Sequence, residues 1–498
     1  MKFPERNRMW IVLAACAMAA VRVFLFAAAF PFFNNVDEQA HVDLVVKYSH
    51  GDIPRGLGPY SPEAADYFAA FRTPEYFRKA EQYGGEFPPP NWQISKDEFE
   101  KIRSEEIPVW ESRANHESGE PPLYYAAAGI WMDVGRACGL HGLTLLYWVR
   151  FLNIPFAVIL VWLGYVTART IFPDNEFAQI GLPVLLALWP QSAFFSIQAD
   201  ALSPICFGFA FLGMAKILSS ERVSPFVAIA TGLGLAAACL VKTSNLPLPL
   251  IALALFGLKL FATRKTTPGA SRFTAFAILL LSLAIPLGSW FAWNFQHFGD
   301  ATATKTKIEL LGWTAKPLSE WFPHPIFTLQ GFAGFWRELI ATFWRGELVW
   351  HLERMASGLA DAFYAISTGI VVLISLWFLL RRIAGNAEQR WSLWLALLSF
   401  LSLVAFMILL SMKFDFGDSP YPSREHPYFV SGRLLNAAAL PFFLLFIFVI
   451  DRIGRWRERQ WISWSLFAAT ALLLLVSQIQ VNAPAFSSRY NFFHRNGA

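Results

Sequence analysis

MWIVLAACAMAAVRVFLFAAAFPF, residues 9–32, is the stretch that decides the fold, and Arg22 is its only charged residue. It is long enough for an α-helix to cross a hydrocarbon core about 30 Å thick. Ten further apolar blocks of similar length follow. We predict eleven transmembrane helices, over residues 9–32, 143–166, 177–195, 201–218, 224–241, 243–262, 274–296, 361–381, 391–412, 434–451 and 462–478.

The composition supports an all-α polytopic membrane protein. The 498 residues are 55% hydrophobic, 16% aromatic and 15% charged, whereas a soluble domain carries about 25% charge. This excludes a soluble enzyme and a disordered scaffold. The net charge of +5 does not indicate a nucleic-acid partner, because the basic residues lie in short clusters between apolar blocks. The cysteines lie in or beside apolar segments, without metal-ligand spacing, so no disulfide framework is predicted.

The basic clusters predict the orientation. They all fall on one side, which should be the cytoplasm, if the interrupted apolar piece 121–137 makes no full crossing. If it crosses, there are twelve helices; we expect an interfacial or half-inserted helix. The N-terminal segment has no clear cleavage site before FPFFNN and reads as an uncleaved first span with a cytoplasmic N-terminus. The clusters are Lys2/Arg6/Arg8, Lys216/Arg222, Lys259/Arg264/Lys265/Arg272, Arg381/Arg382/Arg390 and Arg452/Arg455/Arg457/Arg459.

Three polar stretches then lie outside, at 33–120, 297–360 and 413–433. The first holds nearly half of the acidic residues, and its runs 62–82 and 95–106 are typical of helices lying at the interface. The second is rich in tryptophan and amphipathic, which favours helices at the membrane surface. We divide the chain into a transmembrane module (1–296), the aromatic loop (297–360) and C-terminal helices (361–498).

Asp37 and Glu38 are adjacent carboxylates where the first span ends, with His41 one turn later. A carboxylate there can accept a proton from an acceptor hydroxyl, or hold a divalent cation against a phosphate. The alternative is a helix-capping acidic pair. At the other end of this loop, His116, Glu117 and Glu120 are candidates to face Asp37, or else are solvated loop residues, and the substrate-binding candidate Tyr124 is expected at the membrane surface.

Further polar groups lie at the same outer boundary. Asp200 is either a functional group or a helix cap, and Lys242 either neutralises a lipid phosphate or extends to the interface. Arg433 suits bidentate phosphate binding. Arg22 and Arg150, nearest the membrane centre, are each expected to pair with a helix neighbour or to extend to the interface. The remaining candidates are Asn294, with His297 and Asp300, and Arg424, with His426.

In their order and common side, these residues resemble the glycosyltransferase C superfamily, membrane enzymes that use polyprenyl-phosphate-linked sugars. Protein O-mannosyltransferases and lipid A aminoarabinose transferases belong to it. Asp37-Glu38 matches the acidic motif early in the family's first outer loop, and Asp200 matches an aspartate between later spans. The other matches are Glu120-Pro121-Pro122-Leu123-Tyr124, Trp293-Asn294…Gly299-Asp300 and Gly432-Arg433-Leu434.

Two positions depart from the family pattern. Glu120 replaces a basic residue before the two prolines, and Trp293 replaces an arginine. The role of binding phosphate therefore shifts toward Lys242 and Arg433.

The resemblance implies a glycosyltransferase that moves a sugar from a polyprenyl-phosphate carrier to a hydroxyl of a glycan, lipid or protein on the outer face. Asp37 or Glu38 would be the general base. A divalent cation, Mg²⁺ or Mn²⁺, would lie at Asp37 and Asp200. We expect a bacterial inner membrane with a periplasmic active face. The alternatives are a transporter or flippase of a lipid-linked saccharide, and a non-catalytic subunit of a cell-envelope assembly.

Overall fold

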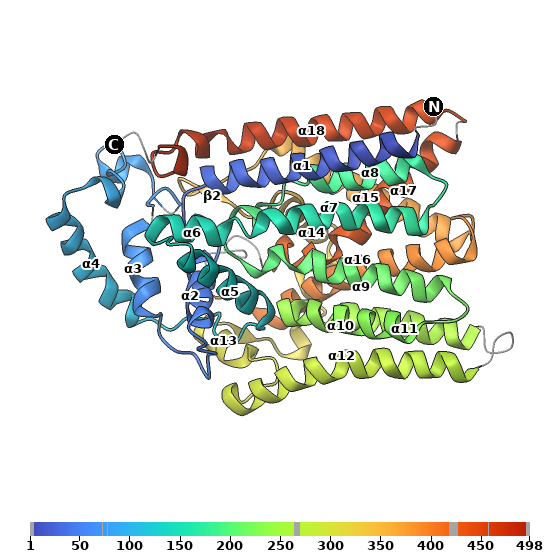
Figure 1. Cartoon of the computed structure of the whole chain (residues 1–498), viewed down its shortest axis with the longest axis horizontal. Coiled ribbons are helices and arrows are strands. Elements are labelled where there is room, and N and C mark those ends of the chain that lie inside the picture. The colour runs from blue at the N-terminus through green and yellow to red at the C-terminus, as the bar shows by residue number, and fades with distance from the viewer. Residues whose placement is uncertain are drawn as a thin grey trace.

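The structure is a computed structural model that describes residues 4–71, 73–76, 78–262, 269–417, 427–456 and 458–494. Long helices run side by side along one axis, and shorter helices gather at one end (Figure 1). The α-helices are α1 (Glu5–Ala29), α2 (Glu38–Ser49), α3 (Pro62–Phe71), α4 (Lys96–Glu111), α5 (Leu123–Ala137), α6 (Gly142–Arg150), α7 (Asn153–Ile171), α8 (Glu176–Leu188), α9 (Ser203–Ser219), α10 (Pro225–Val241), α11 (Pro247–Ala262), α12 (Gly269–Phe298), α13 (Thr304–Leu310), α14 (Leu329–Arg345), α15 (Gly358–Leu380), α16 (Ala387–Lys413), α17 (Ala439–Trp456) and α18 (Gln460–Ser487).

The predicted spans have counterparts in the bundle. Among the described residues, nine helical segments are long and apolar enough to cross a membrane. The predicted spans 177–195 and 224–241 correspond to α8 and α10, which are shorter apolar helices. Helix α8 ends early because Trp189 precedes Pro190 and leaves the helical region, with φ of −57° and ψ of 117°, as expected of a residue before proline.

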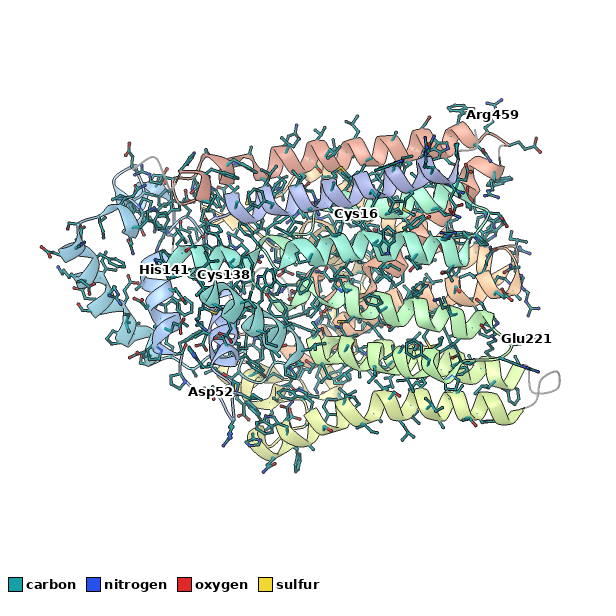
Figure 2. All side chains as sticks on the ribbon, viewed as in Figure 1. Cys16, Asp52, Cys138, His141, Glu221 and Arg459 are labelled. Carbon is teal, nitrogen blue, oxygen red and sulfur yellow. The ribbon has the colours of Figure 1, made fainter. Side chains whose placement is uncertain are left out.

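The bundle has two chemically different ends. Figure 2 shows Glu221 and Arg459 at one end, and Asp52, Cys138 and His141 at the other. We call the latter the outer-loop end. Helix α1 begins at the end opposite the outer-loop end (Figure 1). This agrees with the predicted clustering of basic connections on one side. Lys2, Arg264, Lys265 and Arg457 lie outside the described residues.

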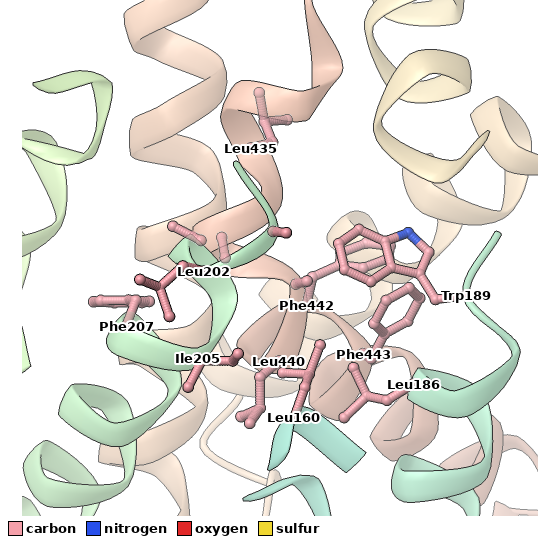
Figure 3. Packing of buried hydrophobic residues seen from close by; sticks show 14 of the residues in the cluster. Leu160, Leu186, Trp189, Leu202, Ile205, Phe207, Leu435, Leu440, Phe442 and Phe443 are labelled. Carbon is pink, nitrogen blue, oxygen red and sulfur yellow. The ribbon is translucent and has the colours of Figure 1, made fainter. Parts of the chain in front are cut away.

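Helix α17 forms the centre of the bundle. Its residues 439–450 are apolar on all sides, which is typical of a fully buried helix, and the apolar part of this span is 94% buried. The indole ring of Trp189, after α8, packs edge-on against Phe443 of α17 at 5.6 Å. Figure 3 shows this packing, with Leu186 near the two rings.

The outer-loop end carries α2 to α6 and α13 (Figure 1). Helix α5, in the segment 121–137, packs against α2 and α6 and is not among the candidate spans, as predicted. The prediction of one helix over 62–82 was wrong at the described residues 73–76, which form a turn, because Pro74 restricts Thr73; a short 3-10 helix follows at Ala80–Tyr83. Helix α4 contains the predicted run 95–106, and the Ser95 hydroxyl caps it by accepting from the Glu98 amide.

Two small antiparallel ladders lie in the outer loops; the first joins the second outer loop to the end of α16, and the second is a local hairpin. Strand β1 (Thr314–Ala315) pairs with β4 (Phe414–Asp415), with Thr314 opposite Asp415. Strand β2 (Val349–Trp350) pairs with β3 (Glu353–Arg354), with Val349 opposite Arg354. The first ladder fixes the second outer loop at the outer end of α16.

Candidate active site

Asp37 stands at the corner between α1 and α2 in a left-handed conformation, with φ of 63°. Phe33, four residues earlier, has φ of 64°. Residues other than glycine are rare in the left-handed region, because their Cβ atom lies too close to the following carbonyl oxygen. Non-glycine residues in such a conformation persist where the surroundings hold them, often at functional sites.

Glu38 holds this corner. Its carboxylate is buried and accepts hydrogen bonds from the backbone amides of Phe33 (2.8 Å) and Ile197 (3.0 Å). It also forms an ion pair with Arg150 at 2.7 Å. The Arg150 guanidinium donates to the carbonyls of Ala27 and Phe30 as well, and so caps the end of α1. Arg150 therefore pairs with neighbouring groups, as expected.

Asp37 faces the opposite way and is 22% exposed. One oxygen, Oδ2, accepts from Arg433 Nη2 at 2.5 Å, and the other, Oδ1, lies 3.2 Å from His116 Nε2. Burial alone would raise the pKa of the Asp37 carboxyl, but the Arg433 guanidinium and His116 hold that pKa below its usual range. Asp37 is therefore ionised, and it is a weak base as long as Arg433 contacts it.

Arg433 connects three carboxylates. Besides Asp37, its guanidinium lies 3.5 Å from Glu347 Oε2 and 3.9 Å from Asp200 Oδ2. It also donates to Gln198 Oε1 at 3.2 Å. The structure thus brings together the sequence-predicted Asp37, Asp200 and Arg433, which are far apart in the chain.

The closing segment of the first loop supplies His116, Glu117 and Glu120. Asn115 fixes it to α2 by donating to the Ala40 carbonyl and to Asp43. Burial would lower the pKa of His116, but its hydrogen bonds to Asp37 and Glu117 raise it to about 9. His116 is therefore an imidazolium at neutral pH. Burial would likewise raise the pKa of Glu117, but Lys307 and His116 hold it low.

Two lysines complete the cluster. Lys307 of α13 forms ion pairs with Glu117 (2.8 Å) and Glu120 (2.9 Å). Lys242, which follows α10, lies 3.6 Å from Asp200 Oδ2 and 3.8 Å from Glu120 Oε2. Burial would lower the pKa of Lys242, but these carboxylates raise it. Lys242 is therefore charged.

Three buried carboxylate oxygens of this charged cluster have no hydrogen-bond donor among the described residues. Glu120 Oε2, Asp200 Oδ2 and Glu347 Oε2 are buried and accept no hydrogen bond from any part of the chain that the structure describes. Burying an unsatisfied acceptor costs about 1–3 kcal/mol. The pKa of both glutamates is raised, chiefly by burial. These oxygens are suited to accept hydrogen bonds from a polar ligand.

The sequence did not single out Lys307 and Glu347. Both lie in the second outer loop, which reads as an aromatic amphipathic segment. The available signal was a charge on the outer side close to a span, the same signal that identified Lys242. For Glu347 we find no comparable pattern.

The remaining sequence candidates have other positions. His41 is buried, its Nδ1 lies 2.7 Å from the Tyr125 hydroxyl, and burial lowers its pKa to about 3, so it is neutral. Tyr124 is buried beside Tyr125. Asn294 donates to the Ala301 carbonyl at 3.1 Å and so fixes the corner between α12 and α13. Arg424 and His426 lie outside the described residues.

The structure offers one set of possible cation ligands in the described residues, Asp37, His116 and Glu117, with one ligand atom of each within 4.8 Å of the others. Each carboxylate directs its second oxygen to a cationic side chain, Arg433 or Lys307. The donors fit a divalent cation, and an imidazole suits Mn²⁺ or Zn²⁺ better than Mg²⁺. The sequence predicted that Asp37 and Asp200 share a cation, but Asp200 is not in this ligand set. The Arg433 guanidinium contacts both carboxylates instead.

Comparison with known proteins supplies a family and a fold. A family model described as "Predicted membrane protein (DUF2142)" matches residues 21–420, and no curated protein matches the sequence. Among solved structures, the archaeal oligosaccharyltransferase AglB from Archaeoglobus fulgidus, in complex with an inhibitory peptide and a dolichol-phosphate, is similar at a TM-score of 0.50 and 11% identity. The similarity covers 97% of this chain and 56% of that one.

A second structure, an Archaeoglobus fulgidus oligosaccharyltransferase in complex with Zn and sulfate, has a TM-score of 0.43 at 11% identity. It covers 94% of this chain and 53% of that one. The chain thus spans about half the length of these structures. The similarity to AglB shows that the fold is of the glycosyltransferase C type, which confirms the fold class predicted from the sequence.

Proposed function

The chain belongs to the DUF2142 family of predicted membrane proteins. We propose that it is a membrane glycosyltransferase. It moves a sugar from a polyprenyl-phosphate carrier to an acceptor hydroxyl. The observation that carries the proposal is Asp37, a partly exposed carboxylate held in a left-handed conformation and shared between Arg433 and His116. The glycosyltransferase C fold supports the same reaction class.

Arg433 and Lys242 receive the donor phosphate. Arg433 begins the last-but-one candidate span, and Lys242 lies between two apolar helices, so both are at the level where a lipid phosphate resides. A guanidinium binds phosphate bidentately, with charge-assisted hydrogen bonds. The phosphate takes the Arg433 Nη2 group that contacts Asp37 in the resting structure.

Asp37 accepts the acceptor's proton. When the phosphate binds Arg433, Asp37 loses its strongest cationic neighbour and its basicity rises. The acceptor oxygen then bonds to the anomeric carbon, its proton moves to Asp37, and the carbon–oxygen bond to phosphate breaks. The leaving phosphate takes the electron pair and is stabilised by Arg433 and Lys242. One oxygen each of Glu120, Asp200 and Glu347 lies near Lys242 or Arg433 but accepts no hydrogen bond from the described residues, and these oxygens accept hydrogen bonds from the sugar hydroxyls.

Asp37, His116 and Glu117 would hold a divalent cation if the enzyme uses one. Such a cation would neutralise charge that develops on the leaving phosphate. His116 would have to be neutral to hold the cation, because a ligating imidazole carries no extra proton.

The charge distribution supports an orientation with the site outside. The last turns of α9, α11 and α17, which carry basic residues, lie opposite the outer-loop end (Figure 1), and basic connections favour the cytoplasmic side. The N-terminus would then be cytoplasmic and the site would face the periplasm of a bacterial inner membrane.

The test is sugar transfer in vesicles containing the purified protein. Radiolabelled polyprenyl-phosphate sugars and a membrane extract as acceptor are supplied to wild type, to Asp37→Asn and to the control Asp52→Asn, which alters an exposed loop aspartate. We expect label in a new product with wild type and Asp52→Asn, and at least about a hundredfold less with Asp37→Asn. Label that stays on the carrier but changes leaflet would instead identify a flippase. Equal transfer by Asp37→Asn would contradict the proposed base.

A further inference from the structure

Five large apolar side chains of the second outer loop project away from the protein. They lie within fifteen residues of chain, between β1 and the second turn of α14. We call them the apolar edge: Leu318 (69% exposed), Phe322 (78%), Phe327 (57%), Leu329 (89%) and Phe332 (44%). An exposed apolar cluster of this kind marks an interaction surface.

The apolar edge is held in a fixed orientation. Between its members, His324 and Ile326 are buried. His324 Nε2 lies 3.2 Å from the Pro427 carbonyl, and its Nδ1 accepts from the Ile326 amide. The alternation of buried and exposed residues therefore turns Phe322, Phe327 and Leu329 outward.

The ends of this segment give its depth along the bundle. It leaves from the outer end of α16, where the Lys316 amide donates to the Lys413 carbonyl at 2.8 Å. In α14, the Trp336 indole donates to the Ala365 carbonyl at 3.0 Å. Ala365 lies seven residues inside the candidate span α15, which corresponds to about 10 Å at 1.5 Å per residue.

Phe332 lies one turn before Trp336 and stacks on it at 6.2 Å. The segment that carries the apolar edge therefore begins at the end of one span, and its last member, Phe332, stacks on a tryptophan that contacts another span about 10 Å along that span. Figure 1 agrees, since α14 lies within the length of the bundle rather than beyond its outer end. Side chains at this depth and on the outside of the bundle face lipid, where aromatic and leucine side chains are favoured.

We infer that the apolar edge inserts into the outer-leaflet interface of the bilayer, at the boundary of headgroups and acyl chains. The partner is the lipid surface, and the inference is independent of the proposed transfer reaction. Other occupants, such as a second copy or another protein, would cover the same side chains without lipid contact.

The other end of α14 contacts the segment that carries Arg433. The Thr342 hydroxyl donates to the Val430 carbonyl at 2.7 Å and accepts from the Gly432 amide at 2.9 Å. A Cβ at Gly432 would lie 2.1 Å from the Phe343 nitrogen, so the two segments are in close contact. Helix α14 thus joins the apolar edge to the segment that carries Arg433. Insertion of the apolar edge into the bilayer therefore sets the level of Arg433 relative to the headgroups.

The test is the collision of a spin label with oxygen and with a water-soluble nickel chelate. Single cysteines replace Phe322 and Leu329 in a chain whose native cysteines are replaced by alanine, in phosphatidylethanolamine–phosphatidylglycerol vesicles. Controls are Glu105→Cys, on the exposed face of α4, and Leu373→Cys, exposed on α15. We expect the oxygen-to-nickel ratio at 322 and 329 to be several-fold above that at 105 and below that at 373.

Two results would overturn the inference. A ratio at 322 and 329 equal to that at 105 would place the edge in water, and labels shielded from both reagents would place it in a protein interface. If the cysteine-free chain does not fold, a photoreactive phenylalanine analogue at position 322 of the native chain serves instead. Cross-links to phospholipid are expected, and cross-links to protein alone contradict lipid contact.

Discussion

Asp37 and Phe33 bracket a corner in which two residues with a Cβ are left-handed. For an L-residue this conformation costs about 1–2 kcal/mol. The contacts of Glu38 on one side, and of Arg433 and His116 on the other, hold the corner in place. Two adjacent carboxylates thus differ in role because the chain turns between them.

Replacing Asp37 by glycine or by alanine separates this strain from the loss of charge. Both variants lose the carboxylate, but glycine adopts a positive φ without steric cost. We expect Asp37→Ala to be less stable than Asp37→Gly by about 1 kcal/mol, measured by thermal unfolding in detergent. Equal stability of the two variants would show that the corner is not strained.

Glu38→Gln leaves the Arg150 guanidinium buried without its counter-charge. Breaking a buried ion pair from one side costs about 3–5 kcal/mol, so we expect a loss near the lower value in the free energy of unfolding. The double variant Glu38→Gln/Arg150→Met should recover part of the loss, since no unpaired charge remains. A wild-type unfolding midpoint for Glu38→Gln would contradict a structural role for this pair.

The sequence predicted two carboxylates, Asp37 and Glu38, at the end of the first span, but not which of them is buried and which faces Arg433. DE at the end of an apolar block indicates carboxylates at the membrane boundary. Which of them is buried depends on Arg150, 112 residues away in the chain, and on a left-handed corner that contains no glycine. Neither has a local signal.

At the scale of elements, the end of α18 docks on the first outer loop. The Ser488 hydroxyl donates to Glu75 Oε2 at 2.6 Å, and the Tyr490 hydroxyl donates to the Pro88 carbonyl at 2.5 Å. Glu75 is buried, and burial raises the pKa of its carboxyl to about 7, although Ser488 and Thr73 act in the opposite direction.

This docking should weaken as the pH rises. The folded protein holds the Glu75 proton more tightly than the unfolded chain, in which the pKa is 4.5. The contribution is therefore complete below about pH 4.5 and is lost as the pH rises to about 7, with a total of about 3 kcal/mol. Limited proteolysis after residue 487 should speed up over this range.

Glu75→Gln is the matched control, because its amide has no proton to lose. Proteolysis of this variant should be independent of pH between 5 and 8. A pH dependence that persists in Glu75→Gln would assign the effect to another group, such as His351, whose amide donates to the Glu75 carbonyl.

Elements were predictable where apolar length decides them. The piece 121–137 is interrupted by polar residues, and α5 accordingly packs within the outer-loop end. The run 62–82 has a helical pattern, yet the helix ends at Phe71 because the proline at 74 acts over a few residues. The approach of α13 to the first loop, through Lys307, depends on the tertiary fold and could not be read from spacing.

At the scale of the whole molecule, one cluster gathers charged side chains from segments that are far apart in the chain. The cluster around Asp37 contains five carboxylates, of Asp37, Glu117, Glu120, Asp200 and Glu347, against the basic groups of Lys242, Lys307 and Arg433. The excess negative charge is balanced in part by the His116 imidazolium. A lipid phosphate must therefore compete with carboxylates for these basic groups, Asp37 for Arg433 above all.

The most direct test of this account is the single-turnover rate of sugar transfer at increasing donor concentration, for wild type and Asp37→Asn. The concentration dependence gives donor affinity and the plateau gives the rate of transfer. Because Asp37 competes with phosphate for Arg433, we predict that Asp37→Asn binds donor several-fold more tightly but transfers at least about a hundredfold more slowly. An unchanged plateau, or a donor affinity that falls along with the rate, would contradict the role of Asp37 as the base that Arg433 restrains.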